Sequence, residues 1–178
     1  MSISTPHPLV LQLRFTRSEF QRGVRGVSDE DGAKRIEPMN AIGWNVGHLA
    51  WQEQYYFLTL AQRQTPLPHI ERDYVSGGPA STPALSEMIV AWRQITAAAD
   101  PWLDGLTGER LLQPFTRADG SPGKRTFGSL LQRVIYHYWY HLGEDLAIRQ
   151  VLGHRRLPQF VGSIDDQAPY RPEETLSD

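Results

Sequence analysis

Apolar residues recur in four stretches of the chain at the three-, four- and seven-residue spacings of an amphipathic helix. The stretches run from about Pro8 to Val27, Asn40 to Arg63, Pro83 to Asp100 and Thr126 to Leu152. Proline in the first turn suits the first and third stretches, and Gly153 suits the end of the fourth. Four such helices predict an all-α fold, a four-helix bundle.

Residues that can cap or break helices refine these boundaries. Asn40 and Thr126 are expected N-caps, and the Ser81–Pro83 segment is expected to open the third helix. Pro101 should end or kink that helix near Asp100. The segment 28–32, with sequence SDEDG, is read as a polar turn.

The connection over residues 64–82 shows no sustained period and contains several helix breakers, among them Pro66, Pro68, Gly77 and Gly78. We predict a long crossover, which allows the second and third helices to run in the same direction. A further turn at 120–123 is expected between two short extended pieces. Gly43 and Gly47 lie one turn apart in the second helix, which is explained if another helix approaches closely there.

Length and composition fit one globular domain. The chain has 178 residues, of which 40% are hydrophobic and 21% charged. We expect one bundle domain over residues 1–168 and a polar tail over residues 169–178. The net charge of −2 gives no electrostatic basis for binding nucleic acid.

Several other classes are excluded on composition or pattern. Because cysteine is absent, disulfides, zinc–thiolate sites and a cysteine nucleophile are impossible. No apolar run approaches the roughly 20 residues of a membrane span, so no membrane partner is expected. The N-terminal residues show no signal peptide, and the expected compartment is the cytoplasm.

His137 and His141 are the strongest candidates for chemistry. A spacing of four residues on one helix sets them about 40° apart around the axis and about 6 Å apart along it. Two imidazoles placed this way can bind one metal ion, since a zinc–nitrogen bond is about 2.0–2.1 Å long. The alternative is a pair of core histidines with two separate hydrogen-bond partners.

Other residues of the second and fourth helices belong to the same hypothesis. His48 can supply a third ligand from a facing helix, or it can be a packed histidine bonded to a carbonyl. Glu144 shares the face of the histidine pair, where it can orient His141, replace a ligand, act as general base, or remain a solvated carboxylate. Asn45, three residues before His48, can line the same pocket, although capping or solvent contact is the favoured expectation. His7, His69 and His154 are expected to be solvated.

Two sequence motifs resemble those of the DinB-like superfamily. The segment 45–51, NVGHLAW, is similar to the second-helix motif, and the segment 137–144, HYWYHLGE, to the motif of the final helix. The segments 149–154 and 157–162 also look like that family. The similarity extends from the first helix to about Gly162.

This resemblance implies an up-down-down-up four-helix bundle with one divalent metal ion on His48, His137 and His141. It also implies a homodimer. The same scaffold hosts thiol-dependent enzymes, namely a mycothiol-dependent maleylpyruvate isomerase and bacillithiol S-transferases, and forms one domain of the sulfoxide synthases of ergothioneine biosynthesis. A small-molecule thiol cosubstrate is therefore an expectation that rests on the resemblance alone.

Two functions follow from these residues. The first is a metal-dependent enzyme of the thiol transferase or hydrolase type, because three neutral histidines leave open positions on the ion. Glu144 is the candidate catalytic residue, and zinc is the expected ion, with nickel, iron or manganese as alternatives. The second is a non-catalytic metal- or ligand-binding bundle in which the ion mainly holds the second and fourth helices together. A third possibility is an interaction bundle that holds no metal.

Overall fold

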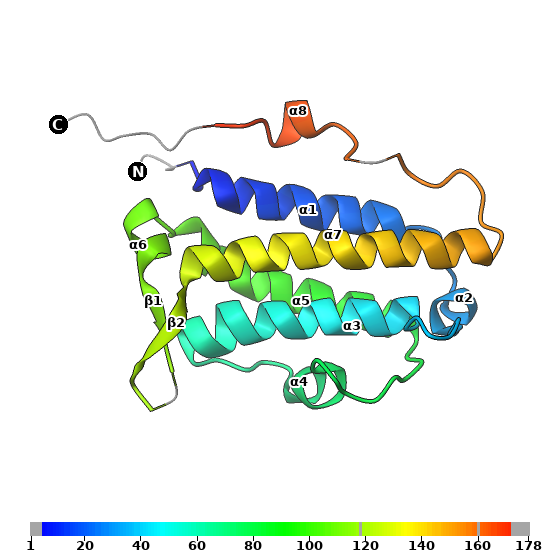
Figure 1. Cartoon of the computed structure of the whole chain (residues 1–178), viewed down its shortest axis with the longest axis horizontal. Coiled ribbons are helices and arrows are strands. Elements are labelled where there is room, and N and C mark those ends of the chain that lie inside the picture. Colours follow the sequence, from blue (N-terminus) through cyan, green and yellow to red (C-terminus); the bar gives the residue numbers. More distant parts are fainter. Residues whose placement is uncertain (1–4, 118, 160, 172–178) are drawn as a thin grey trace.

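The computed structural model describes residues 5–117, 119–159 and 161–171 (Figure 1). Its long helical segments are α1 (Pro8–Val24), α3 (Ile42–Glu53) continued by the π-helix η1 (Gln54–Leu60), α5 (Leu85–Asp104) and α7 (Phe127–Val151). In Figure 1, α1 and α7 run in one direction and α3 and α5 in the other. The predicted up-down-down-up bundle is confirmed.

Shorter elements fill the connections. They are α2 (Asp29–Ala33), α4 (Pro68–Tyr74), α6 (Gly108–Leu112), α8 (Ile164–Gln167) and the antiparallel hairpin of β1 (Pro114–Thr116) and β2 (Pro122–Thr126). The hairpin confirms the two extended pieces. Two predictions were wrong, since α2 replaces the expected turn and α4 lies inside the crossover that was expected to lack regular structure. No helix in the described ranges is both long and apolar enough to cross a lipid bilayer.

The ends of the first and last long helices follow their local sequence. Pro8 occupies the first turn of α1, and the ring nitrogen Nδ1 of His7 accepts a hydrogen bond from the Leu9 amide, 3.1 Å away. At α7, the Thr126 hydroxyl accepts from the Ser129 amide at 3.2 Å, as its cap role predicts. The described α1 is shorter than expected and ends at Val24.

The ends of the middle helices depend on tertiary contacts. Helix α3 begins at Ile42, so Asn40 is not its N-cap. Helix α5 begins at Leu85 rather than at Pro83, and Asp29 of α2 accepts hydrogen bonds from the amide and hydroxyl of Ser86, both at 2.7 Å. This carboxylate replaces the predicted hydroxyl cap. Pro101 does not end α5, because the buried Leu103 packs in the core beyond it.

The core lies between two helix pairs. Helix α3 packs against α5, α1 packs against α7, and α3 also contacts α7. Buried apolar side chains from all four long segments form one cluster, which includes Val10, Leu13, Phe20, Val46, Leu49, Ile95, Leu130 and Val134. Helix α3 is enclosed by its neighbours around most of its circumference, which is why nearly all its residues are buried.

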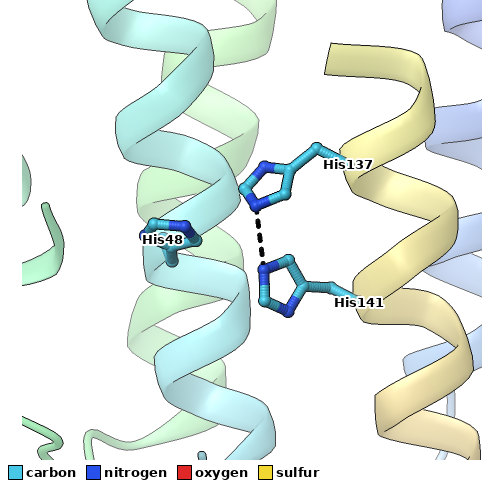
Figure 2. Close-up of side chains that lie close together, drawn as sticks. All are labelled: His48, His137 and His141. Carbon is cyan, nitrogen blue, oxygen red and sulfur yellow. Dashed lines mark hydrogen bonds between the residues drawn. The ribbon is translucent and has the colours of Figure 1, made fainter. Parts of the chain in front are cut away.

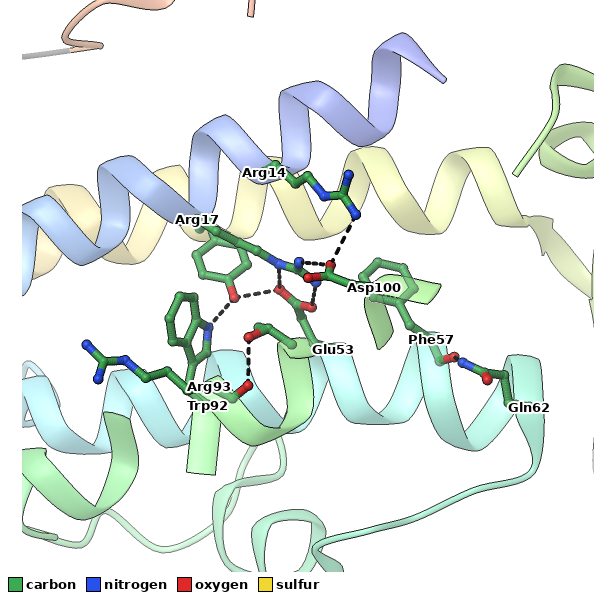
Figure 3. Close-up of polar contacts among 10 residues, drawn as sticks. Arg14, Arg17, Glu53, Phe57, Gln62, Trp92, Arg93 and Asp100 are labelled. Carbon is green, nitrogen blue, oxygen red and sulfur yellow. Dashed lines mark hydrogen bonds and ion pairs between the residues drawn. The ribbon is translucent and has the colours of Figure 1, made fainter. Parts of the chain in front are cut away.

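A buried charged network joins the long helices (Figure 3). The Arg17 guanidinium of α1 donates from Nε to Glu53 Oε1 at 2.8 Å and makes a second bond to Oε2. Its Nη1 reaches Asp100 of α5 at 2.7 Å. From α7, the Tyr138 hydroxyl donates to Glu53 Oε1 at 2.6 Å. The network therefore connects α1, α3, α5 and α7 at one level of the bundle.

Two residues of this network are close in sequence to candidate histidine ligands. Glu53 lies five residues after His48, and Tyr138 directly follows His137. Glu53 is fully buried, so its negative charge depends on Arg17 and on the hydrogen bond from Tyr138. The Tyr138–Glu53 hydrogen bond therefore joins the two helices that carry the candidate ligands, α3 and α7.

Candidate metal site

Three histidines from two facing helices meet inside the bundle (Figure 2). His48 comes from α3, and His137 and His141 come from α7. One ring nitrogen of each histidine lies within 4.8 Å of those of the other two. His48 and His141 are each only 5% exposed, and His137 is partly buried. In the described part of the chain these are the His, Cys, Asp and Glu side chains grouped closely enough to hold a metal ion.

The crossover fixes the tautomer of His48. Its Nδ1 lies 2.7 Å from the backbone carbonyl oxygen of Tyr74, at the end of α4. A carbonyl oxygen can only accept, so Nδ1 carries the proton and Nε2 keeps the lone pair that a metal requires. The hydrogen bond to a carbonyl is therefore compatible with metal binding by His48, because metal-binding histidines commonly donate their second N–H to such an acceptor.

Gly47 makes this contact to α4 achievable. A Cβ atom on Gly47 would lie 2.7 Å from the Tyr74 ring and 3.0 Å from the sulfur of Met88. At Gly43, a Cβ would lie 2.6 Å from the carbonyl oxygen of Pro83. Both distances are too short for any side chain other than hydrogen. The prediction that another helix approaches closely is confirmed at Gly47, where α4 is also the segment that orients His48. At Gly43 the approaching residue, Pro83, precedes α5 and is not helical.

Glu144 orients His141. The His141 Nδ1 lies 2.9 Å from Glu144 Oε2, and because an ionised carboxylate only accepts, the lone pair of His141 is on Nε2. That Nε2 is 3.0 Å from Nε2 of His137. Two nitrogens bound to one ion by bonds of 2.0–2.1 Å are separated by about 2.9–3.4 Å when the angle at the metal is 90–110°. The spacing of this pair therefore fits a shared metal ion.

Asn45 lies deeper than the sequence suggested. It is fully buried, and its Nδ2 donates to Glu144 Oε2 at 3.1 Å and to Asp145 Oδ1 at 2.8 Å. The Asn40 amide adds a contact to the other oxygen of Glu144 at 3.4 Å. The favoured expectation, that Asn45 caps a helix or meets solvent, was wrong. Its side chain instead donates to the Glu144 carboxylate, which in turn accepts from His141.

Burial keeps two of the imidazoles neutral. Removal from water lowers the pKa of His48 to about 4, against a smaller opposing effect of the bond to Tyr74. Burial, with the neighbouring His141 and His48, lowers the pKa of His137 to about 3. The hydrogen bond from His141 lowers the pKa of Glu144. At neutral pH His48 and His137 are therefore unprotonated, which is the form of histidine that binds metals.

Aromatic rings enclose His48 on both faces. The Trp44 ring stacks on it with a centroid separation of 4.8 Å, and the Trp51 ring lies on the other side at 5.2 Å. The indole N–H of Trp44 donates to the Pro79 carbonyl at 3.0 Å. Positions four before and three after His48 lie on the same helix face, which is why both indole rings flank it. Stacked between them, the imidazole is restricted to one plane.

A cleft opens beside the histidines. It has a volume of about 620 Å³, within the range of small-molecule sites. His48 and His137 form part of its wall, together with Trp51, Gln52, Tyr56, Ser76, Ser129, Gln132, Arg133 and Tyr136. A small molecule in this cleft would lie next to the candidate ligands.

The remaining histidines lie apart from this group. His69 is exposed, as predicted. His7 is not simply solvated, because it caps α1. His154 was also wrongly expected to be solvated, since its Nε2 lies 3.1 Å from Asp31 and its Nδ1 accepts from Arg149 at 3.2 Å. These contacts join the end of α7 to α2.

The fold and the histidine site together define a class, that of four-helix bundles able to hold a metal ion between their second and fourth long helices. The family model of the DinB superfamily matches residues 12–144, which is most of the chain. The chain therefore belongs to the DinB superfamily. No curated protein matched it at a significant level of sequence similarity.

Proposed function

We propose that this protein is a metal-dependent enzyme that activates a bound water or thiol, in a hydrolase or thiol S-transferase reaction. The observation that supports this most directly is the position of His48 and His137 in the wall of an open cleft. An ion that only holds helices together would be expected in a site closed to small molecules. When bound, the ion would supply a Lewis acid that lowers the pKa of a water or thiol.

The residues of the chain have distinct parts in this proposal. Three imidazoles hold the ion, and the Tyr74 carbonyl and Glu144 keep two of them in the correct tautomer. Because Glu144 contacts the Nδ1 edge of His141, opposite the Nε2 that meets His137, we assign it a positioning part rather than that of general base. The preference for a thiol rests on the family alone, and zinc is the proposed ion.

The test is an elemental analysis of protein purified without chelators or metal-affinity resin, followed by a thiol-transfer and esterase screen. We expect about one equivalent of metal per chain, lost in His137→Ala and retained in His69→Ala, which alters an exposed histidine. Cobalt substitution then reports on access to the ion. A visible spectrum that does not respond to added azide or imidazole would support the non-catalytic alternative.

A further inference from the structure

Buried polar atoms without partners gather at the cleft. Trp51 Nε1, Gln52 Oε1 and His137 Nδ1 are shielded from solvent, yet none of them hydrogen-bonds to a residue that the structure describes. All three residues line the cleft. A buried polar atom without a partner costs about 1–3 kcal/mol, so such atoms are uncommon unless a ligand or solvent completes them.

Two facing rows of side chains extend from the histidines along this cleft. On α7, Ser129, Arg133 and His137 follow one another at four-residue intervals, and on α3 and η1 the same spacing gives His48, Gln52 and Tyr56. Because α3 and α7 run in opposite directions, both rows extend from the histidines toward the same end of the bundle (Figure 1). Residues four apart on a helix are separated by about 6 Å along its axis.

The charge of the cleft is entirely positive. Of its described lining residues, Arg133 alone carries a formal charge, and no carboxylate lines it. The Arg133 guanidinium makes no ion pair with any residue in the described ranges, but it is close enough to lower the pKa of His137. Among the unpartnered atoms, the Trp51 indole N–H donates, and His137 Nδ1 becomes a donor when Nε2 binds an ion.

We propose that the cleft binds a small carboxylic acid, with its carboxylate on Arg133, a metal-binding group about one helix turn away, and a hydrogen-bond donor facing Gln52 Oε1. This assignment rests on the proposed metal site and names the substrate class for it. A guanidinium suits a carboxylate because it can donate two parallel hydrogen bonds. Excess donors and positive charge along one wall disfavour cationic ligands.

The test uses the metal-loaded full chain and a matched pair of hydroxamates. Succinic monohydroxamic acid and butyrohydroxamic acid have the same chain length and the same metal-binding group, and only the first carries a carboxylate. We expect the acid to bind about ten-fold more tightly by calorimetry, from a charge-assisted bond at a solvent-accessible site. Arg133→Gln should remove this preference while leaving the affinity for butyrohydroxamic acid unchanged, and Arg155→Gln, at an exposed position beyond α7, should keep it.

Gln52→Leu supplies a second test, which distinguishes a ligand-binding glutamine from a purely structural one. Since Gln52 Oε1 has no partner among the described residues, the unliganded protein should keep its melting temperature, while both hydroxamates, which carry N–H and O–H donors, should bind several-fold more weakly. A lower melting temperature with unchanged affinities would assign Gln52 to the fold alone.

The outcomes separate this inference from the proposed function. A protein that binds metal and both hydroxamates with no preference for the acid, or with the same preference in Arg133→Gln, overturns the inference and leaves the metal site intact. A metal-loaded protein that binds neither hydroxamate also overturns it, because the cleft then gives no access to the ion. If the chain binds no metal, the proposed function fails as well.

Discussion

Replacing His48 tests the site through its least obvious ligand. In His48→Ala the bound ion loses one of three protein nitrogens, and the Tyr74 carbonyl loses the Nδ1–H donor at 2.7 Å. The second loss lowers the stability of the unliganded protein by about 1–3 kcal/mol, since a buried acceptor is left without its partner. The informative quantity is therefore the stabilisation that metal adds, not the melting temperature itself.

The size of that stabilisation can be worked out. Structural zinc sites bind with about 10–16 kcal/mol over four ligands, so one ligand corresponds to an affinity change of about 100- to 1000-fold. Metal at 1000 times the parent's Kd stabilises the parent by about 4.1 kcal/mol. The same concentration stabilises the variant by only about 0.4–1.4 kcal/mol. For a chain of this size, those energies correspond to shifts of about 8–16 °C and about 1–6 °C.

The assay is thermal unfolding with and without added zinc or nickel. His48→Phe is a useful companion variant, because an aromatic ring still fills the space between Trp44 and Trp51 but offers no ligand. His69→Ala, at an exposed position, should show the full metal-induced shift. An undiminished shift in both His48 variants would refute the three-histidine site.

Four further predictions follow. In Glu144→Gln, metal affinity should fall about ten-fold, because the amide accepts from His141 more weakly than the carboxylate does. In Glu144→Ala it should fall by up to about 100-fold. Titration calorimetry with zinc measures both affinities, and values equal to that of the parent protein would show that Glu144 has no part in the site. The unliganded protein should lose stability as pH falls from 6.5 toward 4, because the pKa of His48 is about 4 when folded and near 6.5 when unfolded, so the unfolded chain binds more protons there. Urea unfolding at pH 7.0 and 5.5 measures this effect. The free energy of unfolding should decrease by up to about 1.4 kcal/mol per pH unit from this group, and this contribution should be absent in His48→Phe. Glu53→Gln should cost about 3–5 kcal/mol in the free energy of unfolding, since it removes the buried carboxylate that pairs with Arg17 and leaves that guanidinium with only the partly exposed Asp100, and a loss below 1 kcal/mol in urea denaturation would contradict that account of the network. We also propose a homodimer, on the family resemblance, and expect twice the chain mass by light scattering at micromolar concentration; a monomeric mass would oppose it.

The parts of the fold that were predictable are those encoded locally. Helical periodicity gave the four long helices, and the four-residue spacing of His137 and His141 gave the pair that lies 3.0 Å apart. Thr126 was found as a cap because its partner is three residues away. In these cases the sequence neighbours are also the spatial neighbours.

The missed features depend on partners far along the chain. Asn45 contacts Glu144 and Asp145 about a hundred residues later, and no periodicity reports such a contact. The Glu53 network was missed for the same reason, although a buried charge within an apolar helix face was a signal that could have been noticed. Helix α4 was hidden by its short length and by the prolines around it.

The bond between Tyr74 and His48 has a consequence for the crossover. Metal binding draws electron density from the imidazole and strengthens the donor that holds α4 against α3, so occupancy of the site and anchoring of residues 68–74 become linked equilibria. This linkage is reciprocal. If bound metal slows amide exchange or proteolysis through opening of this segment by a certain factor, then opening of the segment weakens the affinity for metal by the same factor. A peptide connection that touches no metal would thereby set part of the affinity for it, and a single cut within the crossover would release the ion more readily without removing any ligand.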